Sequence, residues 1–154
     1  MKNKISKDGK TIHRLDKNYN GDYRVDANVE AISKRSFADC KGLTGVTLPE
    51  TLKTIGEEAF SGCENLRKKV IIPEGVEVIP RECFSGCTGL TEVELPRGVK
   101  QIANGAFYHC PLEKINLEVV LGSLELIGKN AFKGHKFEIP DFPETVKVND
   151  RAFK

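Results

Sequence analysis

Five cysteines and three histidines are the residues of this 154-residue chain best suited to act as nucleophiles, metal ligands or proton-transfer groups. Four of the cysteines recur at a long and nearly constant spacing: Cys40, Cys63, Cys87 and Cys110. Metal binding needs ligands that converge on one point, whereas residues at such a spacing form a line. Cysteine also behaves as a small hydrophobic residue that is commonly buried. We therefore predict a structural ladder of free, buried thiols at these four positions. Stacked strands would bring the four cysteines within the range of a disulfide, but the odd total of five cysteines in the chain favours free thiols.

The remaining polar residues give no pattern typical of an enzyme. His13, His109 and His135 lie in different parts of the chain, and none accompanies a nucleophile and a carboxylate at a spacing suited to acid–base chemistry. The 14 glycines are spread through the sequence rather than gathered into a phosphate-binding loop. The sequence therefore predicts no catalytic residue, no metal, no cofactor and no small-molecule substrate.

Charge and hydropathy narrow the class of partner. The net charge is only +2, and no aromatic residues alternate with the lysines of the basic N-terminal segment, which disfavours nucleic-acid binding. No apolar run approaches the roughly 18 residues that a membrane span needs. We expect a protein partner, with no nucleic acid and no membrane span.

An internal repeat predicts the secondary-structure elements that carry the cysteines and histidines. Phenylalanine recurs at intervals of 21 to 25 residues, at Phe37, Phe60, Phe84, Phe107, Phe132 and Phe153. Within one unit the apolar residues first follow a spacing of three and four, which predicts a short helical turn, and then alternate, which predicts a strand. Such a unit cannot bury its apolar face alone, so consecutive units must stack. We predict a single parallel sheet with one short strand per unit, at 46–48, 70–72, 93–95, 115–117 and 137–139.

The segments "LPETLKTIGEEAFSGCENL" and "LPRGVKQIANGAFYHC" resemble the repeat of BspA-like leucine-rich-repeat proteins, LPxxVxxIGxxAFxxCxxL. The resemblance implies an α/β repeat fold: a right-handed leucine-rich-repeat solenoid with a parallel concave β-sheet and short helical turns. It runs over residues 29–154, as five to six units of which the last is incomplete. Residues 1–28 form an N-terminal hairpin or capping segment, because "ISKDGKTI" has the Asp-Gly pair of a tight turn. Departures from the repeat include Cys83 at an alanine position and His135 at a cysteine position.

Alternation along the strands predicts the binding surface. Residues between the inward apolar positions must point outward, where packing does not constrain them. The candidate protein-binding concave face consists of Arg24, Thr47, Lys69, Ile71, Glu92, Glu94, Lys114, Asn116 and Glu138. Ordinary solvated strand residues are the alternative explanation for these positions.

Two non-catalytic functions follow. The resemblance implies a cell-surface recognition or adhesion domain whose partner is a host-matrix or cell-surface protein. The alternative is an intracellular scaffold or inhibitor that binds a protein partner. The first corresponds to a surface or secreted location with a signal peptide upstream of this sequence, and the second to a cytoplasmic chain that is complete as written.

Overall fold

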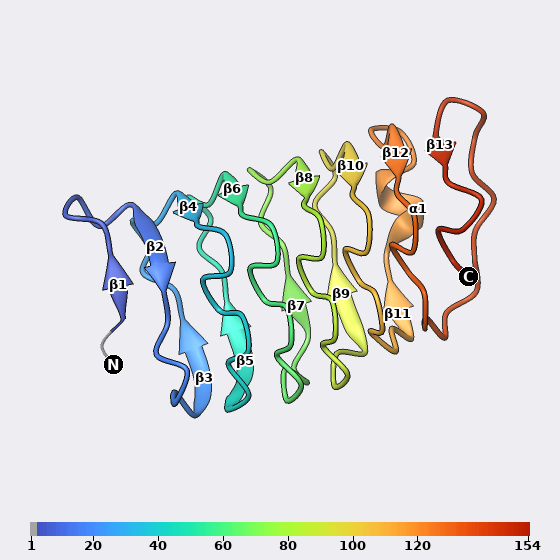
Figure 1. The fold of residues 1–154 in the computed structure, drawn as a ribbon. Coiled ribbons are helices and arrows are strands. Elements are labelled where there is room, and N and C mark those ends of the chain that lie inside the picture. The colour runs from blue at the N-terminus through green and yellow to red at the C-terminus, as the bar shows by residue number, and fades with distance from the viewer. Residues whose placement is uncertain (1–2) are drawn as a thin grey trace.

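The computed structural model describes residues 3–154; Met1 and Lys2, which belong to the expected hairpin segment, lie outside the described residues. The chain winds into a parallel β solenoid of about six coils stacked along one axis, with its two ends at opposite ends of the stack (Figure 1). The predicted solenoid is confirmed. Within the expected N-terminal segment, β1 (Lys4–Ile5) pairs antiparallel with β2 (Thr11–Arg14), and Gly9 between them has a φ of 72°.

Each coil contributes to two rows of strands, so the prediction of one strand per unit was wrong. Row A, along the lower side of Figure 1, consists of β3 (Gly21–Arg24), β5 (Leu43–Thr47), β7 (Val70–Ile71), β9 (Glu92–Glu94) and β11 (Lys114–Ile115). Row B, along the upper side, consists of β2, β4 (Ala31–Ile32), β6 (Thr54–Ile55), β8 (Val78–Ile79), β10 (Gln101–Ile102), β12 (Leu126–Ile127) and β13 (Lys147–Val148).

The predicted single continuous sheet was also wrong, because both rows are interrupted at the same coil boundary. Row A divides into β3-β5 and β7-β9-β11, and row B into β1-β2-β4-β6 and β8-β10-β12-β13. In row B, the N–H of Gly56 donates to Ile32 (2.7 Å) and that of Ala103 to Ile79 (2.9 Å), but Pro80 at the equivalent position has no N–H. In row A, the N–H groups of both Arg67 and Lys68 donate to the carbonyl of Thr44, where the repeat carries an extra residue.

Stacked turns occupy the third side of each coil in place of the predicted helical turn. Two residues per coil have positive φ, for example Glu58 (55°) and Gly62 (75°), and a helix cannot pass through such residues. The apolar residues of this half do point inward, because Leu52, Ala59 and Leu66 are all fully buried. The spacing of three and four therefore identified the buried face but not the element. Among the described residues, the only helix is α1 (Leu117–Val120), in the unit with the longest interval.

No strand forms at 137–139, and the strand predicted at 115–117 is only partly formed, because β11 ends at Ile115 and α1 begins at Leu117. The N–H of Lys136 donates to the carbonyl of Leu112 (2.7 Å), and the chain then leaves the ladder. The coil is short here because nothing between His135 and Phe137 corresponds to the buried Leu90 and Leu112 of the preceding units.

Stacked aromatic rings run through the core along the solenoid axis. The ring centroids of successive repeat phenylalanines are 4.7 to 5.4 Å apart, from Phe37 through Phe60, Phe84, Phe107 and Phe132 to Phe153. Burial of each such ring contributes about 1.5–3 kcal/mol. This stack fixes the rotation of each coil relative to the next and so aligns the outward side chains of rows A and B.

Candidate protein-binding face

The outward side chains of row A come from the strand positions between buried residues. Val46, Val70 and Val93 point into the core, and Thr47, Ile71 and Glu94 are exposed or half-buried beside them. Arg24 and Lys114 are exposed on β3 and β11, and Glu92 is half-buried on β9. Glu138 is exposed but stands on an irregular segment rather than on a strand. Row A therefore presents a surface whose residues do little of the packing.

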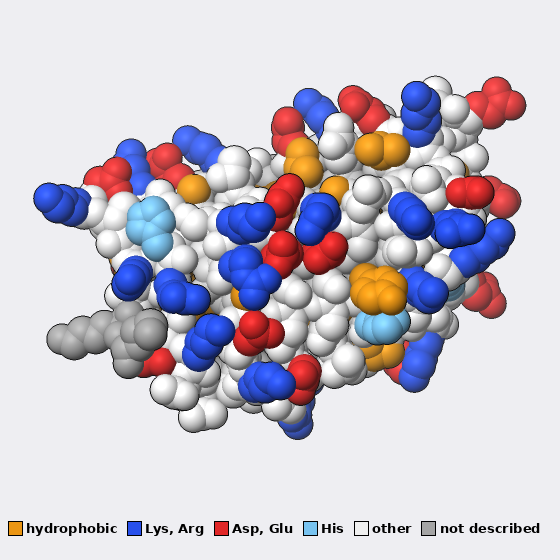
Figure 2. Space-filling view, in the orientation of Figure 1, with side chains coloured by type: hydrophobic (Ala, Val, Ile, Leu, Met, Phe, Trp, Pro, Cys, Tyr) orange, Lys and Arg blue, Asp and Glu red, His pale blue; other side chains and the backbone are white. Residues whose placement is uncertain are grey.

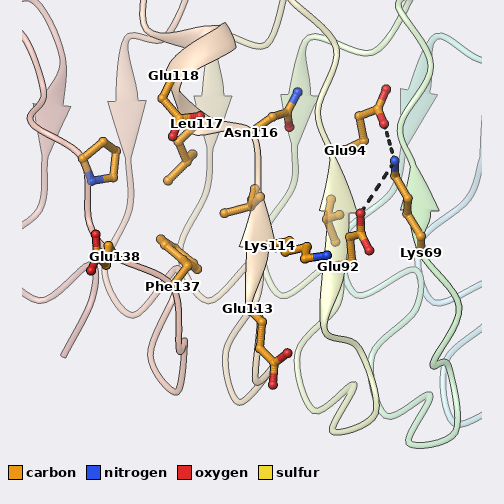
Figure 3. A pocket seen from close by; sticks show the side chains of 13 residues that line it. Lys69, Glu92, Glu94, Glu113, Lys114, Asn116, Leu117, Glu118, Phe137 and Glu138 are labelled. Carbon is orange, nitrogen blue, oxygen red and sulfur yellow. Dashed lines mark ion pairs between the residues drawn. The ribbon is translucent and has the colours of Figure 1, made fainter.

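A hollow of about 400 Å³ gathers six of the nine candidate residues (Figure 3). They are Lys69, Glu92, Glu94, Lys114, Asn116 and Glu138. The Lys69 ammonium lies 2.6 Å from a Glu94 carboxylate oxygen and 3.7 Å from one of Glu92, and the hydrogen bond that Lys69 donates to Glu94 raises the pKa of Lys69. The strands β7 and β9 are thus linked by charge on their outer surface.

The other candidate residues line two further hollows along row A. Arg24 and Thr47 border a hollow of about 440 Å³ together with Pro49. Thr47 also lines a third hollow, of about 220 Å³, with Lys69 and Ile71. Ile71 is 54% exposed, which is unusual for isoleucine and is the highest exposure among the large hydrophobic side chains of the described residues.

Asn116 has a structural task that the sequence did not reveal. Its side-chain amide donates to the carbonyl of Leu95 (2.9 Å) and its carbonyl oxygen accepts from the N–H of Leu95 (2.7 Å). The side chain thus pairs with the backbone next to β9 where β11 ends and α1 begins. Asn116 lines the hollow, but its polar groups are already engaged.

Seven lining residues of the hollow lie outside the predicted face: Val93, Glu113, Ile115, Leu117, Glu118, Phe137 and Pro140. Glu118 lies on α1, which exists only because this unit is longer than the others, and Phe137 lies where a strand was expected. The 25-residue interval before Phe132 and the 21-residue interval after it were the signals of irregular coils at this place.

The cysteine ladder lies in the core, on the inner side of the stacked turns. The thiols of Cys63, Cys87 and Cys110 donate to the carbonyls of Phe37 (3.0 Å), Phe60 (3.1 Å) and Phe84 (2.9 Å), each in the preceding coil. Burial raises the pKa of Cys40 to about 12 and raises those of Cys83 and Cys87. The raised pKa keeps the thiols of Cys40, Cys83 and Cys87 protonated, and all five cysteines are free and buried, unlike reactive cysteines.

The turn side carries paired charges rather than a free surface. The Glu58 side chain is only 13% exposed and forms ion pairs with both Arg35 and Arg81. Lys34 pairs with Glu57 (3.5 Å) and Lys41 with Glu64 (3.1 Å) between adjacent coils. Figure 2 shows basic and acidic side chains next to one another over the middle of the face in view.

The described residues contain neither of two other kinds of site. Within residues 3–154, no cluster of three or more His, Cys, Asp and Glu side chains is arranged to hold a metal ion. Over the same range, no helix has the length and hydropathy to cross a membrane.

The stacked coils, the two strand rows and the open outer face together define a leucine-rich-repeat solenoid, a repeat class that is generally non-catalytic and typical of protein–protein interaction modules. Six copies of the BspA type leucine rich repeat region match residues 21–138, and the chain belongs to this family. The resemblance seen in the sequence is therefore confirmed. No curated protein sequence matches the chain.

Three solved structures share the fold at low sequence identity. A leucine rich cell surface protein from Faecalibacterium prausnitzii is 23% identical, with a TM-score of 0.76 over 90% of this chain and 38% of that one. A leucine-rich repeat protein from Eubacterium ventriosum is 17% identical, with a TM-score of 0.69 over 97% of this chain and 47% of that one. The leucine rich repeat protein of T. pallidum is 21% identical, with a TM-score of 0.57 over 86% and 85%. The chain thus spans less than half the length of the first two.

Proposed function

We propose that this chain recognises a protein partner through row A, with Ile71 at the centre of the contact, as part of a cell-surface recognition or adhesion protein. The observation that carries the proposal is an exposed isoleucine beside a charged rim. Ile71 stands next to Lys69 and Glu94, whose ion pair borders it. Protein interfaces have this arrangement, in which an apolar centre is surrounded by polar residues that exclude water.

The cell-surface part of the proposal rests on one related structure, which is described as a leucine rich cell surface protein. The partner that fits this reading is a host-matrix or cell-surface protein. Large matrix proteins offer extended surfaces, and the side-by-side strands of a solenoid suit such partners.

A matched pair of substitutions tests the face. Ile71 and Val78 are exposed β-branched residues in two-residue strands of the same coil, one in row A and one in row B. Binding of the purified chain to immobilised basement-membrane extract is measured for the wild type, Ile71→Asp and Val78→Asp. We expect Ile71→Asp to weaken binding at least tenfold and Val78→Asp to leave it unchanged, with both variants equally stable. Equal losses would place the contact outside row A.

A photo-crosslinking residue at position 71 or 78, in the source cells, tests the function independently of the chosen matrix. Adducts that form from position 71 alone, on intact cells, support the proposal. Adducts found only after cell lysis would favour an intracellular scaffold instead, and adducts from position 78 alone would move the contact to row B.

A further inference from the structure

Row A ends one coil earlier than row B. In row B, β12 is followed by β13, which pairs with it in parallel. In row A, β11 is the last strand of its sheet, because residues 137–139 pass by without pairing. An unpaired strand edge presents N–H and C=O groups that can pair with another extended chain.

Next to β9, a side chain rather than a strand backbone already makes the pairing hydrogen bonds. Asn116, which follows the two-residue strand β11, pairs with both the N–H and the C=O of Leu95 through its side chain. The coil that should follow β11 is shortened, and its Phe137 side chain lies between its own segment and β11 (Figure 3).

The lining of the hollow beside β11 combines apolar and acidic side chains. Ile115, Leu117, Phe137 and Pro140 supply apolar surface. Side chains of an added strand alternate between its two faces. One set would contact these apolar residues, and the other set would face the glutamates and lysines that form the rim of the hollow.

The rim selects for positive charge. Five glutamates and two lysines line the hollow, a formal balance of −3. Lys69 is already paired with Glu92 and Glu94. Within residues 3–154, no lysine or arginine forms an ion pair with Glu113, Glu118 or Glu138, in contrast to the paired charges of the turn side. Complementary charge of this kind sets partner specificity and association rate.

We infer that the edge of β11 binds an extended, lysine- or arginine-bearing segment of a protein by strand addition. The inference rests on the proposed function, because it names the chemistry of a partner of row A. The segment pairs its backbone with β11, places an apolar side chain over Phe137 and Leu117, and directs its cationic side chains to Glu113 and Glu138.

Synthetic peptides test the inference directly. The probe is a fluorescein-labelled heptapeptide of alternating lysine and valine, and its binding to the full chain is followed by polarisation at low ionic strength. Two matched peptides accompany it: one with glutamate in place of lysine, and one with every second amide N-methylated to remove the pairing edge. We expect the lysine peptide to bind and both matched peptides to bind at least tenfold more weakly.

Matched protein variants locate the site. Glu138→Lys lies on the rim, and Glu125→Lys makes the same charge change at an exposed position beside β12 in row B. We expect a loss of tenfold or more for Glu138→Lys and none for Glu125→Lys, with Glu138→Gln giving an intermediate loss.

Three outcomes would overturn the inference: no binding of the lysine peptide, binding that survives N-methylation, or equal losses in the two charge variants. None of them affects the comparison of Ile71→Asp with Val78→Asp, so this inference can fail while the proposed function stands.

Discussion

At the scale of single residues, two positions per coil hold the backbone in a conformation that suits glycine. All six non-glycine residues with positive φ in the described chain occupy these positions: Arg35, Asp39, Glu58, Glu82, His109 and Asn130. An ordinary residue there costs about 1–2 kcal/mol. The stacked turns therefore store strain wherever the sequence departs from glycine.

Gly86→Ala tests this strain. Gly86 has a φ of 74°, and a Cβ there would meet its nearest atom only at 3.7 Å, so crowding adds nothing. We expect the free energy of unfolding to fall by about 1 kcal/mol in urea denaturation. The control is Gly98→Ala, where φ is not left-handed and no atom lies within 4 Å of the added carbon. That variant should be neutral or more stable by up to about 1 kcal/mol. Equal effects would show that the turn conformation is not what matters.

The buried thiols predict a loss of stability at alkaline pH. Burial raises the pKa of Cys40 to about 12 in the folded chain, whereas the unfolded thiol has its ordinary value near 9. Because only the unfolded state ionises between these values, the stabilisation is complete below pH 9 and is lost as the pH rises towards 12. Cys40→Ala should reduce this slope by up to about 1.4 kcal/mol per pH unit, measured by urea denaturation with reductant from pH 8 to 11. An unchanged slope would mean that the Cys40 thiol ionises in the folded state.

At the scale of elements, the sequence predicted which residues point inward better than it predicted the elements themselves. Apolar spacing depends on which side chains are buried, and a tight stack of turns with two left-handed residues buries them at nearly helical intervals. Pro80 could have revealed the break in row B, but only once a second strand was known to precede it. The end of row A at β11 could not be predicted from the sequence. The shorter interval between Phe132 and Phe153 shows that residues are missing from this coil, but it does not show whether row A, row B or the turn side loses them.

The candidate face was predicted in the same uneven way. Simple alternation placed Thr47, Ile71 and Glu94 correctly on the outer side of row A, because each stands beside a buried residue of a regular strand. Alternation failed beyond β11, where Asn116 turns its amide to the backbone and Glu138 leaves the strand. The role of the candidate face in binding stays a prediction.

Asn116→Ala tests the structural role of the side chain that ends β11. Removal of the amide leaves the N–H and C=O of Leu95 without these partners, and we expect a loss of about 1–2 kcal/mol in the free energy of unfolding. The amide proton of Leu95 should also exchange faster with solvent. Lys114→Ala, at the exposed end of the same strand, should change stability by less than about 0.5 kcal/mol. A stable Asn116→Ala variant with slow exchange at Leu95 would show that water replaces the side chain at no cost.

At the scale of the whole molecule, the coil boundary between β6 and β7 divides the solenoid into two parts. Neither strand row is continuous across it. The parts are joined instead by the hydrogen bonds from Arg67 and Lys68 to Thr44, by stacked turns and by the core. In the core, Phe60 and Phe84 stack with centroids 5.0 Å apart, and in the turns the N–H of Phe60 donates to the carbonyl of Cys83 (2.8 Å). In a solenoid each coil contacts only its neighbours, so cooperative unfolding depends on every such interface. A boundary held by fewer kinds of contact is where cooperativity should fail first.

Phe84→Ala and Phe107→Ala test this division. Both rings are fully buried and stack on both sides, so each substitution should cost about 3–5 kcal/mol. Phe84 lies at the interrupted boundary, whereas β8, β10 and β12 pair continuously around Phe107. We therefore expect Phe84→Ala to unfold in two steps and Phe107→Ala in one. Urea titration followed by NMR, with amides of β4 and β12 as separate probes, distinguishes these results. Coincident midpoints for the two probes in Phe84→Ala would show that the contacts remaining across the boundary are sufficient to transmit cooperativity from one part of the solenoid to the other.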